Sequence, residues 1–204
     1  MKFDSHIIQR WLREKRFSRI RKKLRDKDVT LIANNCVAGC VLHDFGKRFD
    51  TPTVNLYIPF PDYIIFLKHI QKYAYAEIKD ITNGECHPVG LLGGVIRLHF
   101  LHYKTFNEGV SAWKRRMERV HWDNMYVVLV ERDGCSYQDL KDFEKLPFEH
   151  KVALTKRMYP KLKNTFFMED YVNCSEVGDI MRFNNFFGKR GYDVFNWIHF
   201  LGLN

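Results

Sequence analysis

The sequence predicts a three-layer α/β/α fold built around a mixed, mostly parallel sheet. Residues 125–130 read MYVVLV, an apolar run rich in β-branched residues that is typical of a strand buried on both faces. Shorter apolar runs at 29–33 and 151–155 alternate along the chain with segments of helical periodicity. A chain of 204 residues with 46% hydrophobic residues can bury one substantial core but is short for two domains.

The first expected element is a helix over residues 6–24, because its apolar side chains recur at helical spacing. Residues 1–28 contain eleven Lys and Arg against four acids, so most of the net charge of +9 lies there. We therefore divide the chain into a basic amphipathic N-terminal helix (1–28) and a single α/β domain (29–204). The helix can lie on the inner leaflet of a membrane, burying Trp11, Phe17 and Ile20, or it can pack on the domain.

Strands and helices alternate in the next part of the predicted fold. A strand is expected at 29–33 (VTLIA), and another at 54–58 (VNLYI) after Thr51-Pro52. A helix over 63–75 follows Pro61-Asp62, a pair that suits a helix start. Residues 95–103 (VIRLHFLHY) then read as a strand in which His99 and His102 lie on opposite faces. These two histidines are therefore not expected to share a metal ion.

The second half continues the alternation. A helix over 107–120 places Trp113 and Met117 inward and precedes the central strand. A helix over 136–146 begins with Ser136 and Asp139, which are spaced as in a capping box. A strand at 151–155 and a last helix at 193–203, docked through Trp197 and its apolar neighbours, complete the prediction.

The strongest candidate site is the tip of the central strand, where charge follows the apolar run directly. Ligands of open α/β sheets bind at the carboxyl ends of strands. Glu131 and Asp133 alternate along an extended segment, so both can point the same way and hold a divalent cation, Mg²⁺ or Mn²⁺, against a diphosphate. An ordinary turn at Asp133-Gly134 is the competing interpretation.

Other polar residues complete this candidate site. Asn34 and Asn35 follow the strand at 29–33 and offer amide donors to a sugar or phosphate, or else cap the next helix. The remaining candidates are cations for a phosphorylated ligand and general bases for an acceptor hydroxyl. The cations are Arg116 and Arg132, and the bases are His99, His102 and Asp123. Asp133 is counted with the catalytic residues through the cation that it would hold.

Composition argues against several classes of protein. No apolar run approaches the roughly 18 residues of a membrane-spanning helix, and the charged N-terminus is unlike a secretory signal. The expected location is the cytoplasm, with peripheral contact of residues 6–24 with the inner membrane as a further option. Five irregularly spaced cysteines argue against a disulfide framework. Cys36 and Cys40 have a spacing seen in some metal sites, but no second Cys or His pair is suitably spaced, so zinc is not expected there. Because the basic charge is confined to the leading segment, no nucleic-acid partner is expected.

Several short motifs recur together in the order of a known family. They are Asn34-Asn35-Cys36 with Gly39, Thr51-Pro52, Pro61-Asp62-Tyr63, Pro88-Val89-Gly90, His99-Phe100-Leu101-His102-Tyr103, Trp113 with Arg116, Trp122-Asp123-Asn124, Arg132-Asp133-Gly134-Cys135 and Leu146-Pro147. With them the chain resembles the bacterial exopolysaccharide-biosynthesis family of unknown biochemical function, number nineteen-nineteen in the domain-of-unknown-function series. The resemblance implies a three-layer α/β/α fold and a gene setting among capsule enzymes, and it implies no catalytic residue.

The leading functional hypothesis is a transferase of bacterial exopolysaccharide or capsule biosynthesis. A glycosyltransferase would take a nucleotide-sugar donor, and its acceptor would be a lipid-linked saccharide at the membrane. One alternative is a sugar O-acyltransferase, in which a histidine activates the acceptor or in which Cys36 or Cys135 carries the acyl group. The other alternative is a non-catalytic adaptor of a polysaccharide assembly complex.

Overall fold

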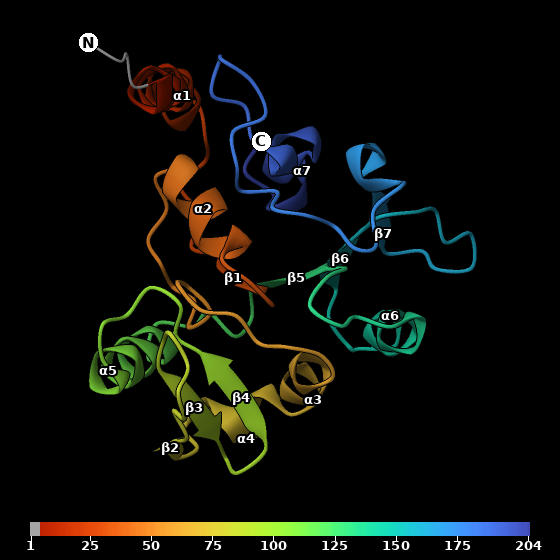
Figure 1. Ribbon diagram of the computed structural model, residues 1–204. Coiled ribbons are helices and arrows are strands. Elements are labelled where there is room, and N and C mark those ends of the chain that lie inside the picture. Colours follow the sequence, from red (N-terminus) through yellow and green to blue (C-terminus); the bar gives the residue numbers. More distant parts are fainter. Residues whose placement is uncertain (1–4) are drawn as a thin grey trace.

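The computed structural model describes residues 5–204 and confirms the predicted α/β class (Figure 1). Parallel and antiparallel strands occur as expected, but they form two sheets. One is a parallel sheet of order β1-β5-β6-β7 and the other an antiparallel sheet of order β2-β3-β4. The strands are β1 (Thr30–Ala33), β2 (Ile78–Asp80), β3 (Val89–Leu92), β4 (Ile96–His99), β5 (Met125–Val130), β6 (His150–Thr155) and β7 (Thr165–Phe167).

The helices cover both faces of the parallel sheet. They are α1 (Ser5–Arg21), α2 (Val37–Asp44), α3 (Asp62–Lys68), α4 (Ile70–Ala74), α5 (Phe106–Met117), α6 (Tyr137–Glu144) and α7 (Trp197–Phe200), with 3-10 turns η1 (Glu169–Tyr171) and η2 (Gly191–Val194). In Figure 1, α1, α2 and α7 lie on one side of the parallel sheet, and α3, α6 and the antiparallel sheet lie on the other. The arrangement is that of three layers.

Strand β5 supplies side chains to two separate hydrophobic cores. Val127 and Leu129 pack in the core on the side of α3, α5 and α6. Tyr126, Val128 and Val130 pack in the core on the side of α1, α2 and the C-terminal segment. This burial on both faces is the physical reason why residues 125–130 form a continuous apolar run instead of an alternating one.

Helix α1 docks on the domain through a buried arginine. Arg13 is 5% exposed and lies between the carboxylates of Asp44 and Asp193. One turn further on, Phe17 is buried in the core of α2 and the C-terminal segment. Of the two expected placements, insertion of Phe17 into lipid is therefore wrong, because the domain itself covers this face of the helix. Trp11, by contrast, is 59% exposed.

Several expected boundaries differ from those observed. Residues 54–58 are not a strand, since only Tyr57 pairs with His99 through a single bridge. The helix expected at 63–75 is interrupted at His69, and the one expected at 193–203 divides into η2 and α7. Strands β2, β3 and β7, of three or four residues each, were not predicted. Such short strands carry too few residues for a period to emerge, and they exist because a partner strand pairs with them.

Among the described residues, no helix is both long enough and apolar enough to pass through a membrane. The observed capping box at the start of α6 matches the expected one. Ser136 accepts a hydrogen bond from the backbone N–H of Asp139, and the Asp139 carboxylate accepts one from Ser136.

Candidate functional site

The carboxyl ends of β1 and β5 lie side by side, because the two strands are parallel neighbours. Asn34 joins them just beyond their last residues. Its Nδ2 donates to the Val130 carbonyl at 3.1 Å, and its Oδ1 accepts from the Val130 N–H at 2.8 Å. The Asn34 amide thus continues the sheet and is occupied by backbone, so the ligand role predicted for it does not fit its position.

Asn35 is placed differently. It is only 4% exposed, and its Oδ1 accepts a hydrogen bond from the Val37 N–H at the start of α2. Its buried Nδ2 has no hydrogen-bond partner among the described residues. The first turn of α2 also lacks a side-chain cap at Cys36. The Asn35 Nδ2 is therefore an unsatisfied donor at the end of β1, where an anionic or oxygen-rich ligand could accept from it.

The two carboxylates after β5, those of Glu131 and Asp133, have different surroundings. Glu131 is buried, with Oε2 accepting from the Lys156 N–H at 2.9 Å and Oε1 from the Tyr159 hydroxyl at 2.5 Å. Both of its oxygens are engaged in holding the segment after β6. The expected pairing of Glu131 with Asp133 around one cation is therefore not formed in the structure, because Glu131 turns inward to satisfy these two donors.

Asp133 remains at the surface of the site. It adopts a left-handed conformation with φ +55°, which Asp tolerates better than most residues. Its Oδ2 accepts from Nε of Arg132 at 3.1 Å, and its N–H donates to Glu176 at 2.9 Å. Burial raises the pKa of the Asp133 carboxyl and the Glu176 charge adds to this, while Arg132 and His99 act in the opposite direction.

The end of β4, in the second sheet, interacts electrostatically with this carboxylate. The ring of His99 stacks on that of Tyr57 with centroids 4.3 Å apart, and the two residues exchange both backbone hydrogen bonds. Burial and the neighbouring His87 lower the pKa of His99. Burial and the charge of Asp133 raise the pKa of the Tyr57 hydroxyl. Asp133 is thus electrostatically coupled to both rings.

We call this group of residues the carboxyl-edge site; it consists of Asn35, Tyr57, His99, Arg132 and Asp133. The charge of Arg132 also acts on the thiol of Cys36, next to Asn35, which links the loop after β1 to the loop after β5. Of the predicted residues, the structure thus brings Asn35, His99, Arg132 and Asp133 into one region. Tyr57 was not predicted, and no local pattern marks it, because its role arises from the bridge to β4.

Three predicted residues lie elsewhere. His102 is exposed beyond the end of β4, and Arg116 is buried, donating to the Val54 carbonyl at 3.1 Å and to the hydroxyl of Tyr103. Arg116 therefore anchors the loop before α3 and does not face a ligand. Asp123 precedes β5 whereas Asp133 follows it, so a strand of six residues, roughly 20 Å, separates them.

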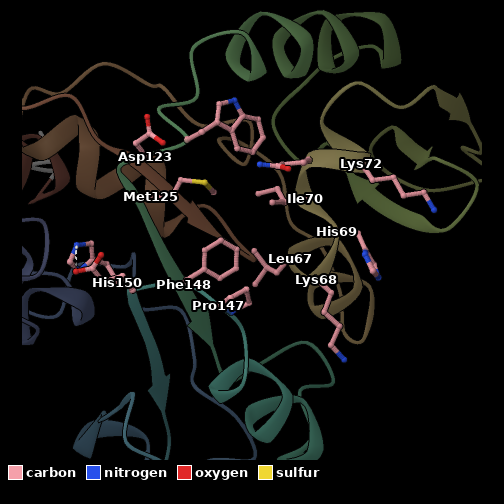
Figure 2. A pocket seen from close by; sticks show the side chains of 13 residues that line it. Leu67, Lys68, His69, Ile70, Lys72, Asp123, Met125, Pro147, Phe148 and His150 are labelled. Atoms are coloured by element: carbon pink, nitrogen blue, oxygen red, sulfur yellow. Dashed lines mark ion pairs between the residues drawn. The ribbon is translucent and has the colours of Figure 1, made fainter.

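Asp123 instead lines a cavity of about 570 Å³ at the amino ends of β5 and β6 (Figure 2). Its wall combines aromatic rings with basic side chains; it includes Lys68, Lys72, Trp122, Phe148 and His150. This cavity lies at the edge of the sheet opposite to the carboxyl-edge site. We place the chemistry at the carboxyl edge because titratable groups with shifted pKa values and an unpartnered amide converge there.

The thiols of the chain are poor nucleophiles where they are buried. Burial raises the pKa of the Cys36 thiol to about 11. Burial, together with the charges of Asp139 and Glu131, raises the pKa of Cys135 even further. Because the thiolate is the reactive form, neither cysteine is prepared to carry an acyl group at neutral pH.

Comparison with known proteins gives one family and one relative. The model of a domain of unknown function, DUF1919, matches residues 7–202. A protein of Haemophilus influenzae described as an uncharacterized protein is 32% identical over 179 residues, which cover 88% of this chain and 86% of the relative. The match thus includes both sheets and every residue of the carboxyl-edge site, and the chain belongs to the DUF1919 family.

Proposed function

We propose that this protein is a glycosyltransferase of bacterial exopolysaccharide or capsule biosynthesis that uses a nucleotide-sugar donor at the carboxyl-edge site. The observation that carries the proposal is the convergence of an unpartnered, buried amide (Asn35), a cation (Arg132) and a carboxylate of raised pKa (Asp133) at the ends of two parallel strands. The choice of a polysaccharide precursor as substrate follows the family resemblance noted from the motifs.

Each residue has a defined role in this proposal. The Asn35 amide binds the diphosphate of the donor, and Arg132 offsets the charge that develops on it as the sugar leaves. Asp133 accepts the proton of the acceptor hydroxyl. A bond forms between the acceptor oxygen and the anomeric carbon, while the bond from that carbon to the diphosphate breaks and its electron pair leaves with the nucleoside diphosphate.

The acceptor is proposed to be a lipid-linked saccharide, reached by peripheral contact of α1 with an anionic membrane. Ile7 and Trp11 are exposed on α1, one turn apart. Phe186 and Phe187 are exposed on the loop that Gln9 of α1 contacts through the Asn185 carbonyl at 2.9 Å. Aromatic side chains beside the basic residues of α1 form the combination that binds the headgroup region of such membranes.

The first test measures binding of nucleotide sugars to the full-length protein, with and without Mg²⁺ or Mn²⁺. Binding is detected by the shift in unfolding temperature and by ligand-observed NMR. A donor present at a hundredfold its dissociation constant stabilises the folded state by about 2.7 kcal/mol. In the Asn35→Asp variant the free amide becomes a carboxylate of the same size, which keeps the acceptor for the Val37 N–H but repels a diphosphate. We expect this variant to lose most of the donor-induced stabilisation.

The second test separates the two edges of the sheet with a matched pair of variants. Asp133→Asn should bind the donor but transfer sugar at least about a hundredfold more slowly, since general-base catalysis contributes 10²–10⁴-fold. Asp123→Asn should transfer at the wild-type rate. If Asp123→Asn is the damaging change, the cavity at the amino edge is the site. If no nucleotide sugar binds to the wild-type protein, the proposal fails in favour of the adaptor.

A further inference from the structure

A group of potential metal ligands lies at the end of the antiparallel sheet and shares His99 with the carboxyl-edge site. Glu85, His87 and His99 bring one ligand atom each to within 4.8 Å of one another. Nε2 of His87 and Nδ1 of His99 are 3.0 Å apart. Two ligands of a tetrahedral zinc ion, each 2.0–2.1 Å from the metal, lie roughly 3.3 Å apart. The two ring nitrogens are thus within a few tenths of an ångström of the separation that such an ion requires.

The fold itself creates this arrangement. In the β3–β4 pair Val89 is opposite His99, so the loop that precedes β3 passes beside the end of β4. That loop carries Glu85 and His87, and it is fixed at its base. The N–H of Val89 donates to the hydroxyl of Thr82, whose own N–H donates to the Asp80 carboxylate. Glu85 and His87 are therefore presented by a tethered loop.

Both imidazole rings are also oriented by their other contacts. Tyr57 stacks on His99 and pairs with its backbone, which fixes the plane of that ring. The second nitrogen of His87, Nδ1, lies 3.4 Å from the sulfur of Cys86. With the proton on Nδ1 donated to this sulfur, the lone pair of Nε2 points toward His99. Metal-binding histidines regularly donate their far N–H to a carboxylate, a carbonyl or water, and the Cys86 sulfur takes that position here.

We propose that Glu85, His87 and His99 bind one Zn²⁺ ion, with a fourth position left for water or for an oxygen of a bound ligand. Two imidazoles and a carboxylate are a ligand set of open zinc sites, and they are softer than the all-oxygen sets that Mg²⁺ and Ca²⁺ prefer. The proposal does not depend on glycosyl transfer. It assigns the metal to residues other than Glu131, whose oxygens are engaged.

One other group among the described residues brings three potential ligand atoms together, and neighbouring arginines already neutralise one of its carboxylates. It consists of Asp28, Asp50 and His121. Nε of Arg48 and Nε of Arg119 each lie 3.4 Å from the Asp50 carboxylate. Two guanidinium groups on one carboxylate disfavour a cation beside it. This group therefore provides an internal comparison for the experiment.

The test is zinc binding to the tag-free, full-length protein after treatment with a chelator. Calorimetric titration and elemental analysis should give one Zn²⁺ per chain, and Co²⁺ in its place should give the visible absorption of a low-symmetry site. His87→Gln and His99→Gln should each weaken Zn²⁺ binding at least about tenfold, since even loss of an outer-shell partner costs 10–100-fold. His102→Gln and His121→Gln are the matched controls and should bind as the wild type does.

The outcomes are separable from those for glycosyl transfer because none of them measures activity. Zn²⁺ should raise the unfolding temperature of the wild type and of His102→Gln but not that of His87→Gln, whose side chain lies in a loop and whose fold is checked by circular dichroism. Absence of saturable binding to the wild type overturns the proposal. Binding that persists in His87→Gln but is lost in His121→Gln also overturns it.

Discussion

Replacing Arg13 by Met tests how α1 is held on the domain. The guanidinium donates to both oxygens of Asp44 and of Asp193, to the Gly188 carbonyl and to the Tyr192 hydroxyl. Burial disfavours the charge on Arg13, but its hydrogen bonds with Asp193 and Asp44 outweigh burial and raise its pKa. The variant retains most of the apolar volume and removes the charge.

The expected loss of stability follows from what remains after the change. Asp193 keeps the guanidinium of Arg16 at 3.0 Å and the N–H of Arg190 at 3.1 Å. Asp44 keeps the hydroxyl of Tyr192. Among residues 5–204, no other cationic side chain lies as close to the Asp44 carboxylate as Arg13 does. Removing one partner of a buried ion pair costs about 3–5 kcal/mol, a large part of the 5–15 kcal/mol that stabilises a typical domain.

The cost should also depend on pH. In the wild type, burial alone would raise the pKa of Asp193, but Arg13 lowers it. The ionised Asp193 therefore stabilises the folded state above its unfolded pKa, and this stabilisation is lost as the pH falls through its folded pKa. In Arg13→Met the buried Asp193 carboxylate lacks this cation, its pKa rises relative to the wild type, and part of the lost stability is regained as the pH falls. The difference between the two proteins is therefore largest near neutral pH and narrows in acid.

Urea unfolding, monitored by circular dichroism between pH 4 and pH 8, measures both the loss of stability and its dependence on pH. Arg10→Met is the matched control, since Arg10 is exposed on the same helix and its loss should change stability by less than about 0.5 kcal/mol. The double variant Arg13→Met with Asp44→Leu should recover part of the loss, because it removes the stranded charge. A loss below about 1 kcal/mol for Arg13→Met at pH 7 would refute the reasoning and leave apolar contacts as the means of docking.

Three further predictions concern other parts of the chain. Iodoacetamide at pH 7.5 should alkylate the exposed Cys86 within minutes but leave Cys36, whose pKa is about 11, unmodified until the protein unfolds. Peptide mass spectrometry measures both reactions, and faster alkylation of Cys36 than of Cys86 would contradict the prediction. Gly109→Ala in α5 should destabilise the protein by about 1–3 kcal/mol in urea, although alanine favours helices, because its Cβ would lie 2.7 Å from the ring of Phe100; a gain in stability would show that the ring can move. Trp11→Ser should reduce flotation with anionic vesicles severalfold at unchanged unfolding temperature, and equal flotation of both proteins would argue against membrane contact through α1.

The sequence alone determined those elements whose physical cause is local. Residues 125–130 were recognisable as the central strand because a strand buried on both faces must be apolar throughout, and β5 has that environment. The start of α6 was recognisable because Ser136 and Asp139 satisfy each other's backbone N–H groups within four residues. The edge of the sheet that carries Asn35 and Asp133 followed from parallel strands ending together.

The tertiary structure alone decided how side chains from distant segments pair. Glu131 and Asp133 are alike in sequence, yet Glu131 turns inward because Tyr159 and the N–H of Lys156 meet it there. Whether Phe17 or Trp11 faced the domain depended on Asp44 and Asp193, which lie 31 and 180 residues from Arg13 and enclose its charge. Such partners leave no period or spacing in the chain, because the free energy of a buried charge depends on what the whole fold brings beside it.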